Sequence, residues 1–178
     1  MSLDLDGAER AFAASADGTV GIEEEFAVLD PQSLDLVPRF EELRDNAADD
    51  AVLTGSIAGE LISSEIEIRS APGRDVHDAL ASQREVRARL FAHAAAHGVA
   101  LGSTGTHPWA DYREQPNIDT EHYRRVVDGL QYVARRNNTF SLHAHVGVRG
   151  LDRAVRVCDR LRPVLPVLLE PGVGVIAE

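Results

Sequence analysis

Three pairs of side chains able to bind a cation recur in the sequence, each with its members two residues apart. They are Glu23 and Glu25, Glu65 and Glu67, and His143 and His145. In a β-strand, residues two apart project from the same face, so each pair aims two ligands at one side of a sheet. Crowded carboxylates raise each other's pKa unless a cation lies between them, and hard divalent cations prefer oxygen ligands. The pairs together therefore indicate a Mg²⁺ or Mn²⁺ site with one or two imidazoles near it, whereas a single pair also fits a solvated strand face.

Alternating apolar residues predict the strands that carry these pairs, over residues 19–29, 61–70, 99–103 and 139–148. Helical periodicity predicts helices over residues 76–96, from about Thr120 and from about Asp152, the last ended or kinked by Pro163 and Pro166. Residues 1–18 form a loose or helical lead-in. The order favours a single α+β domain over residues 1–178, with a largely antiparallel sheet and helices packed on one face.

Composition narrows the classes of function. The chain has 178 residues and a formal charge of −11, which disfavours nucleic acid and anionic membrane surfaces as partners. We see no run of about 20 apolar residues, and the N-terminus is acidic where a signal peptide is basic, so we expect a cytoplasmic protein. The single cysteine, Cys158, falls in a helical pattern and is interpreted as a buried apolar side chain.

Common nucleotide-binding loops are absent from the sequence. The glycine-containing segment 102–107 reads Gly-Ser-Thr-Gly-Thr-His and lacks the Gly-Lys-Ser/Thr of a phosphate loop. If the protein binds ATP, we expect it to do so through metal ions on a sheet.

Four ordered motifs resemble the carboxylate-amine ligases related to glutamate-cysteine ligase. They are Thr-Val-Gly-Ile-Glu-Glu-Glu-Phe at 19–26, Glu-Leu-Ile-Ser-Ser-Glu-Ile-Glu-Ile at 60–68, Gly-Thr-His-Pro-Trp at 105–109 and Phe-Ser-Leu-His-Ala-His-Val-Gly-Val at 140–148. The resemblance covers roughly residues 19–169 and implies a sheet similar to that of glutamine synthetase, with a metal-filled cleft that holds ATP. It also implies that ATP phosphorylates the γ-carboxylate of glutamate and that an amine, such as that of cysteine, then displaces phosphate. Cations suit this chemistry because an anionic carboxylate must attack an anionic triphosphate.

Site residues follow from the resemblance, motif by motif. The implied ligands of Mg²⁺ or Mn²⁺ are Glu23, Glu25, Glu60, Glu67 and His143; the implied ATP contacts are His143, His145 and Arg69; and the implied catalytic residues are Glu67 and His145.

Some of these assignments stay open. Glu60 and Glu67 are an odd number of residues apart, so a regular strand would aim them at opposite faces, and Glu65 is the alternative ligand. Arg69 fits an ion pair with its neighbours as well as a substrate contact. His107 and Trp109 fit either the cleft wall or a packed turn.

Members of the family are about twice as long as this chain, so we expect it to correspond to the N-terminal half of the domain. Such a half would expose an open sheet edge and favour homo-oligomers or other self-association. Two other functions remain: a metal-dependent hydrolase that uses the histidine pair, and a non-catalytic remnant or binding subunit.

Overall fold

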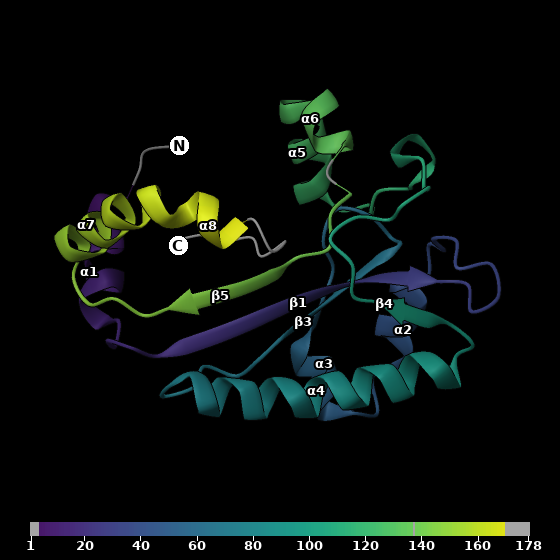
Figure 1. Cartoon of the computed structure of the whole chain (residues 1–178), viewed down its shortest axis with the longest axis horizontal. Helices are drawn as coiled ribbons and strands as arrows, with labels where there is room; N and C mark the ends of the chain where they lie inside the picture. Colours follow the sequence, from purple (N-terminus) through teal and green to yellow (C-terminus); the bar gives the residue numbers. More distant parts are fainter. Residues whose placement is uncertain (1–3, 137, 170–178) are drawn as a thin grey trace.

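A five-stranded antiparallel sheet organises the chain in the computed structural model, which describes residues 4–136 and 138–169 (Figure 1). The strands are β1 (Val20–Leu29), β2 (Ile57–Ala58), β3 (Glu65–Arg69), β4 (Ala100–Gly102) and β5 (Leu142–Val146). The long central strand β1 pairs with β3 along one edge, and β2 lies beyond β3. Both β4 and β5 pair with the other edge of β1, at its end and its beginning respectively. The predicted α+β class with an antiparallel sheet is confirmed.

Helices accompany this sheet, and the longest of them packs against it. They are α1 (Leu5–Ala14), α2 (Phe40–Asn46), α3 (Ala51–Ser56), α4 (Val76–Ala96), α5 (Glu121–Leu130), α6 (Tyr132–Arg135), α7 (Leu151–Leu161) and α8 (Leu165–Leu169), with 3-10 turns at Tyr112–Glu114 and Arg162–Val164. Helix α4 runs along one face, as predicted, and local signals fix its ends. The Asp75 carboxylate caps the first turn by accepting from the backbone N–H groups of His77 and Asp78, and Gly98 has a positive φ of 70° just after the helix.

The main core lies between α4 and the sheet. Phe26 and Ile66, from β1 and β3, are fully buried there, together with Leu90 of α4. Phe26 and Phe91 meet edge to face, with ring centroids 5.3 Å apart. This core fixes the plane of the sheet, so the side chains that alternate with Phe26 along β1 point away from α4.

Glu24 is the exception on the apolar side of β1. Its carboxylate forms an ion pair with Arg87 of α4 and accepts a hydrogen bond from Gln83 Nε2 at 3.0 Å. The guanidinium of Arg87 also lies over the ring of Phe26. The charge that interrupts the apolar pattern of β1 therefore ties this strand to α4.

Two predicted strands are shorter in the structure. Residues 61–64 form a turn rather than the start of β3, because Glu65 N donates to Ile62 O and Ser63 N donates to Pro116 O instead of to a neighbouring strand. The predicted strand 139–148 is regular only at Leu142–Val146, and its apolar side chains are exposed, since α4 packs mainly against β1, β3 and β4.

The ends of the described chain meet at the start of β1. Helices α1 and α7 pack together there: Gly150 N donates to Phe12 O, and Arg153 Nη1 lies 2.5 Å from Asp17 Oδ2. Residues 5–14 of the expected lead-in are thus helical. Residues 170–178 lie outside the described part of the chain. Among the helices described, none is long and apolar enough to cross a membrane.

We expect Arg87→Ala to lower the free energy of unfolding by about 1–3 kcal/mol, because it leaves the mostly buried Glu24 carboxylate without its cation. Arg74→Ala is the matched control, since Arg74 pairs with Asp78 on the exposed surface and its loss should lower the free energy of unfolding less than Arg87→Ala does. Urea denaturation of both variants measures the difference. Equal losses would show that the Glu24–Arg87 pair contributes no more than a surface ion pair.

Candidate metal centre

Strand pairing brings the three predicted pairs to one face of the sheet. Glu25 lies opposite Glu67 in the β1–β3 register, and Glu23 lies opposite His143 in the β1–β5 register. Directly opposed residues of antiparallel strands project from the same face, and this face is turned away from α4. The sheet therefore gathers carboxylates and imidazoles from strands that are far apart in sequence.

A first ligand group consists of Glu23, His143 and His145. Glu23 Oε2 lies 3.3 Å from His143 Nδ1 and 3.2 Å from His145 Nε2, and one ligand atom from each residue lies within 4.8 Å of the others. Burial by itself would raise the pKa of Glu23, but hydrogen bonds with His143 and His145 outweigh it and lower the pKa. Glu23 is therefore held as a carboxylate, the form that binds a cation.

A second ligand group consists of Glu25, Glu60 and Glu67, again with ligand atoms within 4.8 Å of one another. Glu25 and Glu67 are buried, and Glu25 Oε2 accepts a hydrogen bond of 2.6 Å from Ser141 N. Glu60 joins the group from the irregular backbone before β3, so its odd spacing from Glu67 is no obstacle. His143 Nε2, 3.9 Å from Glu25 Oε1, connects the two groups.

Glu65, the alternative to Glu60, is buried beside the second group but is not a member of it. Burial, followed by the charges of Glu25 and Glu60, raises the pKa of Glu65 to about 10. Within the described residues its Oε1 atom has no hydrogen-bond partner. The geometry thus selects Glu60 for the three-carboxylate group and places Glu65 against its edge.

Arg69 lies between the two groups. Its Nε atom is 2.5 Å from Glu67 Oε1 and 3.2 Å from Glu23 Oε1. Half of the Arg69 side chain remains exposed, so the guanidinium also faces the open side of the site. The ion pairs with neighbouring carboxylates are confirmed, and a contact with ATP stays a prediction.

The motif with His107 and Trp109 lies outside both ligand groups. His107 Nε2 is 2.8 Å from Leu34 O, and Trp109 Nε1 donates to Asp35 Oδ1 at 2.8 Å. These hydrogen bonds hold the motif against the loop that follows β1. They favour the interpretation of the motif as a packed turn.

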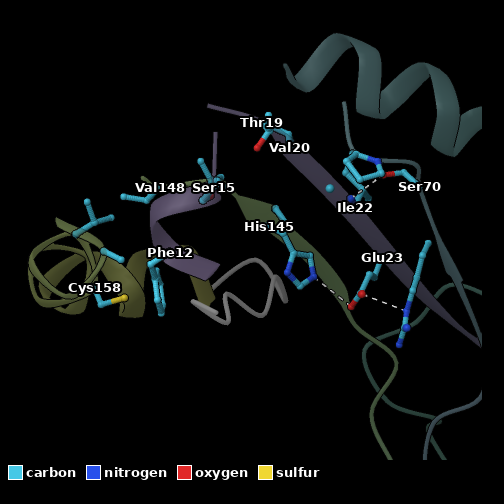
Figure 2. A pocket seen from close by; sticks show the side chains of 18 of the residues that line it. Phe12, Ser15, Thr19, Val20, Ile22, Glu23, Ser70, His145, Val148 and Cys158 are labelled. Carbon is cyan, nitrogen blue, oxygen red and sulfur yellow. Dashed lines mark hydrogen bonds and ion pairs between the residues drawn. The ribbon is translucent and has the colours of Figure 1, made fainter. Parts of the chain in front are cut away.

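A cavity of about 830 Å³ adjoins the first ligand group (Figure 2). Glu23, Arg69 and His145 line its polar part. Its other walls are mostly apolar and come from the sheet and from α1 and α7, with Phe12 and Cys158 among them. Figure 2 shows His145 and Glu23 directed toward each other, with Phe12 and Cys158 at the opposite end. The sequence offered no signal for this cavity, because the helices that complete it come from the two ends of the described chain.

Comparison with known proteins shows which family the chain resembles. The family model of glutamate-cysteine ligase family 2 matches residues 19–169, which include every member of both ligand groups. The chain belongs to glutamate-cysteine ligase family 2. The resemblance expected from the sequence motifs is thereby confirmed.

Curated relatives carry the same name. The chain is 37% identical over 163 residues to the glutamate–cysteine ligase of Halobacterium salinarum, covering 92% of this chain and 44% of that protein. It is 38% identical over 151 residues to a Rubrobacter xylanophilus protein provisionally named glutamate–cysteine ligase 2-1, covering 85% of this chain and 40% of that protein. The chain therefore spans less than half the length of the family members that it matches.

The second ligand group of this family member is poorly neutralised by the protein alone. Burial raises the pKa of Glu67 to about 7, although hydrogen bonding and charge from Arg69 oppose the rise. Burial and the charge of Glu25 also raise the pKa of Glu60. At neutral pH the negative charges of these carboxylates therefore repel one another.

We expect the metal-free protein to lose stability as pH rises from 5 to 8. The pKa of Glu67 is higher in the folded state, so its contribution is fully present below its ordinary value of 4.5 and is lost as pH approaches about 7. The loss from Glu67 should be on the order of 3 kcal/mol. Urea denaturation in EDTA across this range measures it.

Glu67→Gln should flatten the pH dependence, because a neutral amide has no proton to lose. Glu9→Gln, which changes an exposed carboxylate of α1, should leave it as in the original protein. A pH profile of Glu67→Gln that matches the original would show that the carboxylates do not repel one another in the folded state.

Proposed function

We propose that the chain forms the metal- and ATP-binding part of an ATP-dependent carboxylate-amine ligase that joins glutamate to an amine, with cysteine as the expected amine. The observation that carries this proposal is the pair of adjoining ligand groups on one sheet face, next to a cavity. Family membership supports the ligase class over a metal-dependent hydrolase. Since the chain spans less than half of its relatives, we assign the complete activity to a protein of full family length.

The donor atoms suit Mg²⁺ or Mn²⁺. The second group offers carboxylate oxygens alone, and the first combines one carboxylate with two imidazoles. Hard divalent cations take such oxygen-rich sets, whereas a structural zinc site typically has thiolates. The protein alone leaves the pKa values of Glu60 and Glu67 raised, and it leaves Glu65 Oε1 without a hydrogen-bond partner among the described residues. Cations held by Glu23 and His143 and by Glu25, Glu60 and Glu67 would neutralise both the glutamate carboxylate and the triphosphate.

The cavity is our proposed nucleotide pocket. Its polar part, formed by Glu23, Arg69 and His145, suits the triphosphate, and its apolar walls suit the adenine ring. His143 and His145 would contact phosphate oxygens, and Arg69 would add its guanidinium. Because Arg69 contacts both Glu23 and Glu67, we propose that the transferred phosphoryl group lies between the two ligand groups.

The proposed reaction has two steps. A γ-carboxylate oxygen of glutamate attacks the γ-phosphorus of ATP, and the bond from this phosphorus to the bridging oxygen breaks, releasing ADP. The amine nitrogen then attacks the acyl carbon, phosphate leaves, and the amine loses a proton to give the amide. We propose that Glu67 and His145 orient the reacting groups. We also propose that the reaction takes place in the cytoplasm.

We expect ATP to raise the melting temperature only together with Mg²⁺ or Mn²⁺, because carboxylates would otherwise repel the triphosphate. Differential scanning fluorimetry with ATP in EDTA, and with ATP and Mg²⁺, makes the comparison. Equal stabilisation under both conditions would overturn the metal-bridged arrangement.

A bulky side chain introduced into the cavity should block nucleotide binding and leave metal binding intact. Cys158→Phe should abolish the shift due to Mg-ATP while preserving the shift due to Mn²⁺ alone. Val155→Phe is the matched control, because Val155 is exposed on the same helix and is absent from the cavity lining. An undiminished Mg-ATP shift in Cys158→Phe would place the nucleotide elsewhere.

The ligase assay measures ADP and γ-glutamylcysteine from ATP, glutamate and cysteine, using the 178-residue protein alone and mixed with the remaining polypeptide of a family member. We expect product from the mixture, far slower product formation by the chain alone, and a loss of about 100-fold or more in Glu67→Gln. Product formation that is unchanged in Glu67→Gln would contradict the proposed site.

A further inference from the structure

Glu60 reaches the second ligand group from backbone that no strand ladder holds in place. It lies between β2 and the turn at 61–64. Its orientation must therefore come from contacts made by the residues on either side of it. On the C-terminal side, Leu61 O accepts a hydrogen bond of 3.0 Å from Ile118 N.

On the N-terminal side, the Tyr123 hydroxyl donates a hydrogen bond to Gly59 O. Gly59 is closely enclosed: a Cβ at this position would lie 2.6 Å from the Phe40 ring and 2.8 Å from Ile118 Cδ1. The backbone therefore has little room to shift toward Phe40, and the tyrosine hydroxyl fixes its carbonyl. The segment that carries Glu60 is clamped on both sides by residues 118–123.

We propose that Tyr123 is a positioning residue for the second metal site and acts through the Gly59 carbonyl to hold the Glu60 carboxylate against Glu25 and Glu67. This inference rests on the proposed metal-dependent function. The sequence predicts a helix from about Thr120 but gives no sign of the contact between the Tyr123 hydroxyl and Gly59, because the two residues are 64 positions apart.

The hydroxyl can be removed without removing the packing of α5. Val126 and Val127, on the same helix, pack together with the Tyr123 ring against an apolar cluster of Leu61, Ile62 and Ala134. Tyr123→Phe keeps the aromatic ring and deletes only the donor, so we expect the helix to remain docked. The variant thus isolates the hydrogen bond to Gly59.

Mn²⁺ titration followed by electron paramagnetic resonance distinguishes the two sites. Manganese in the first group should show magnetic coupling to histidine nitrogen, whereas manganese in the second group should lack directly bound nitrogen. We expect Tyr123→Phe to weaken the nitrogen-free site by about 10-fold and to leave the histidine site unchanged, since residues that orient metal ligands typically contribute 10- to 100-fold in affinity.

Two control variants separate positioning from packing. Tyr132→Phe removes the hydroxyl of an exposed tyrosine that accepts from Arg136, and it should leave both sites unchanged. Val126→Ala reduces the packing of α5 while keeping the Tyr123 hydroxyl. The positioning role would be overturned if Tyr123→Phe weakened Mn²⁺ binding equally at both sites. It would also be overturned if Val126→Ala weakened binding at the nitrogen-free site as much as Tyr123→Phe does.

The double variant tests whether Tyr123 acts through Glu60. If it does, Tyr123→Phe should weaken binding no further in a Glu60→Gln background. Additive losses would overturn this route. Failure of the original protein to bind Mn²⁺ would overturn the proposed metal-dependent function itself, whereas two sites that both persist unchanged in Tyr123→Phe would overturn the positioning role alone.

Discussion

Repulsion among carboxylates crowded on one face of a sheet is the constraint around which the protein is arranged. Two full charges about 4.8 Å apart repel by roughly 3 kcal/mol at an effective dielectric constant of 20. Glu25, Glu60 and Glu67 approach one another within this distance, and Glu65 adds a fourth carboxyl group beside them. Several such terms equal the whole stability of a typical domain, about 5–15 kcal/mol. The fold must therefore supply stability elsewhere and leave the carboxylates for a cation to neutralise.

The apolar layer between α4 and the sheet supplies much of that stability. Phe26, Ile66 and Ile68 alternate along β1 and β3 with the carboxylates, so the residues that build the core also set the direction of the ligands. On the carboxylate face, Arg69 offsets part of the charge by pairing with Glu23 and Glu67. Because this compensation is partial, the face keeps negative charge that can attract a cation.

Local signals explain the parts of the structure that the sequence predicts well. Asp75 and Gly98 mark both ends of α4, and a spacing of two predicts that His143 and His145 share a face. These features depend on residues that are close in the chain. The ion pair between Glu24 and Arg87, by contrast, depends on the packing of α4, so the sequence showed only an interrupted apolar pattern.

Long-range contacts explain what the sequence leaves open. The choice between Glu60 and Glu65 depends on the turn at 61–64, which Pro116 and Gln115 hold through hydrogen bonds to Ser63 and Ser64. The sequence pattern predicts a strand through this turn because its side chains alternate in character as they do in a β-strand. Likewise, the apolar side of β5 resembles a core face in sequence, yet Val146 is 59% exposed because that strand lies beyond the main cover of α4.

Crystals grown with MnCl₂ and measured at the manganese absorption edge would test the two-site arrangement most directly. We expect two anomalous peaks, one within reach of Glu23, His143 and His145 and the other among Glu25, Glu60 and Glu67. Manganese absent from both groups at saturating concentration, or bound solely at other surface carboxylates, would contradict the arrangement.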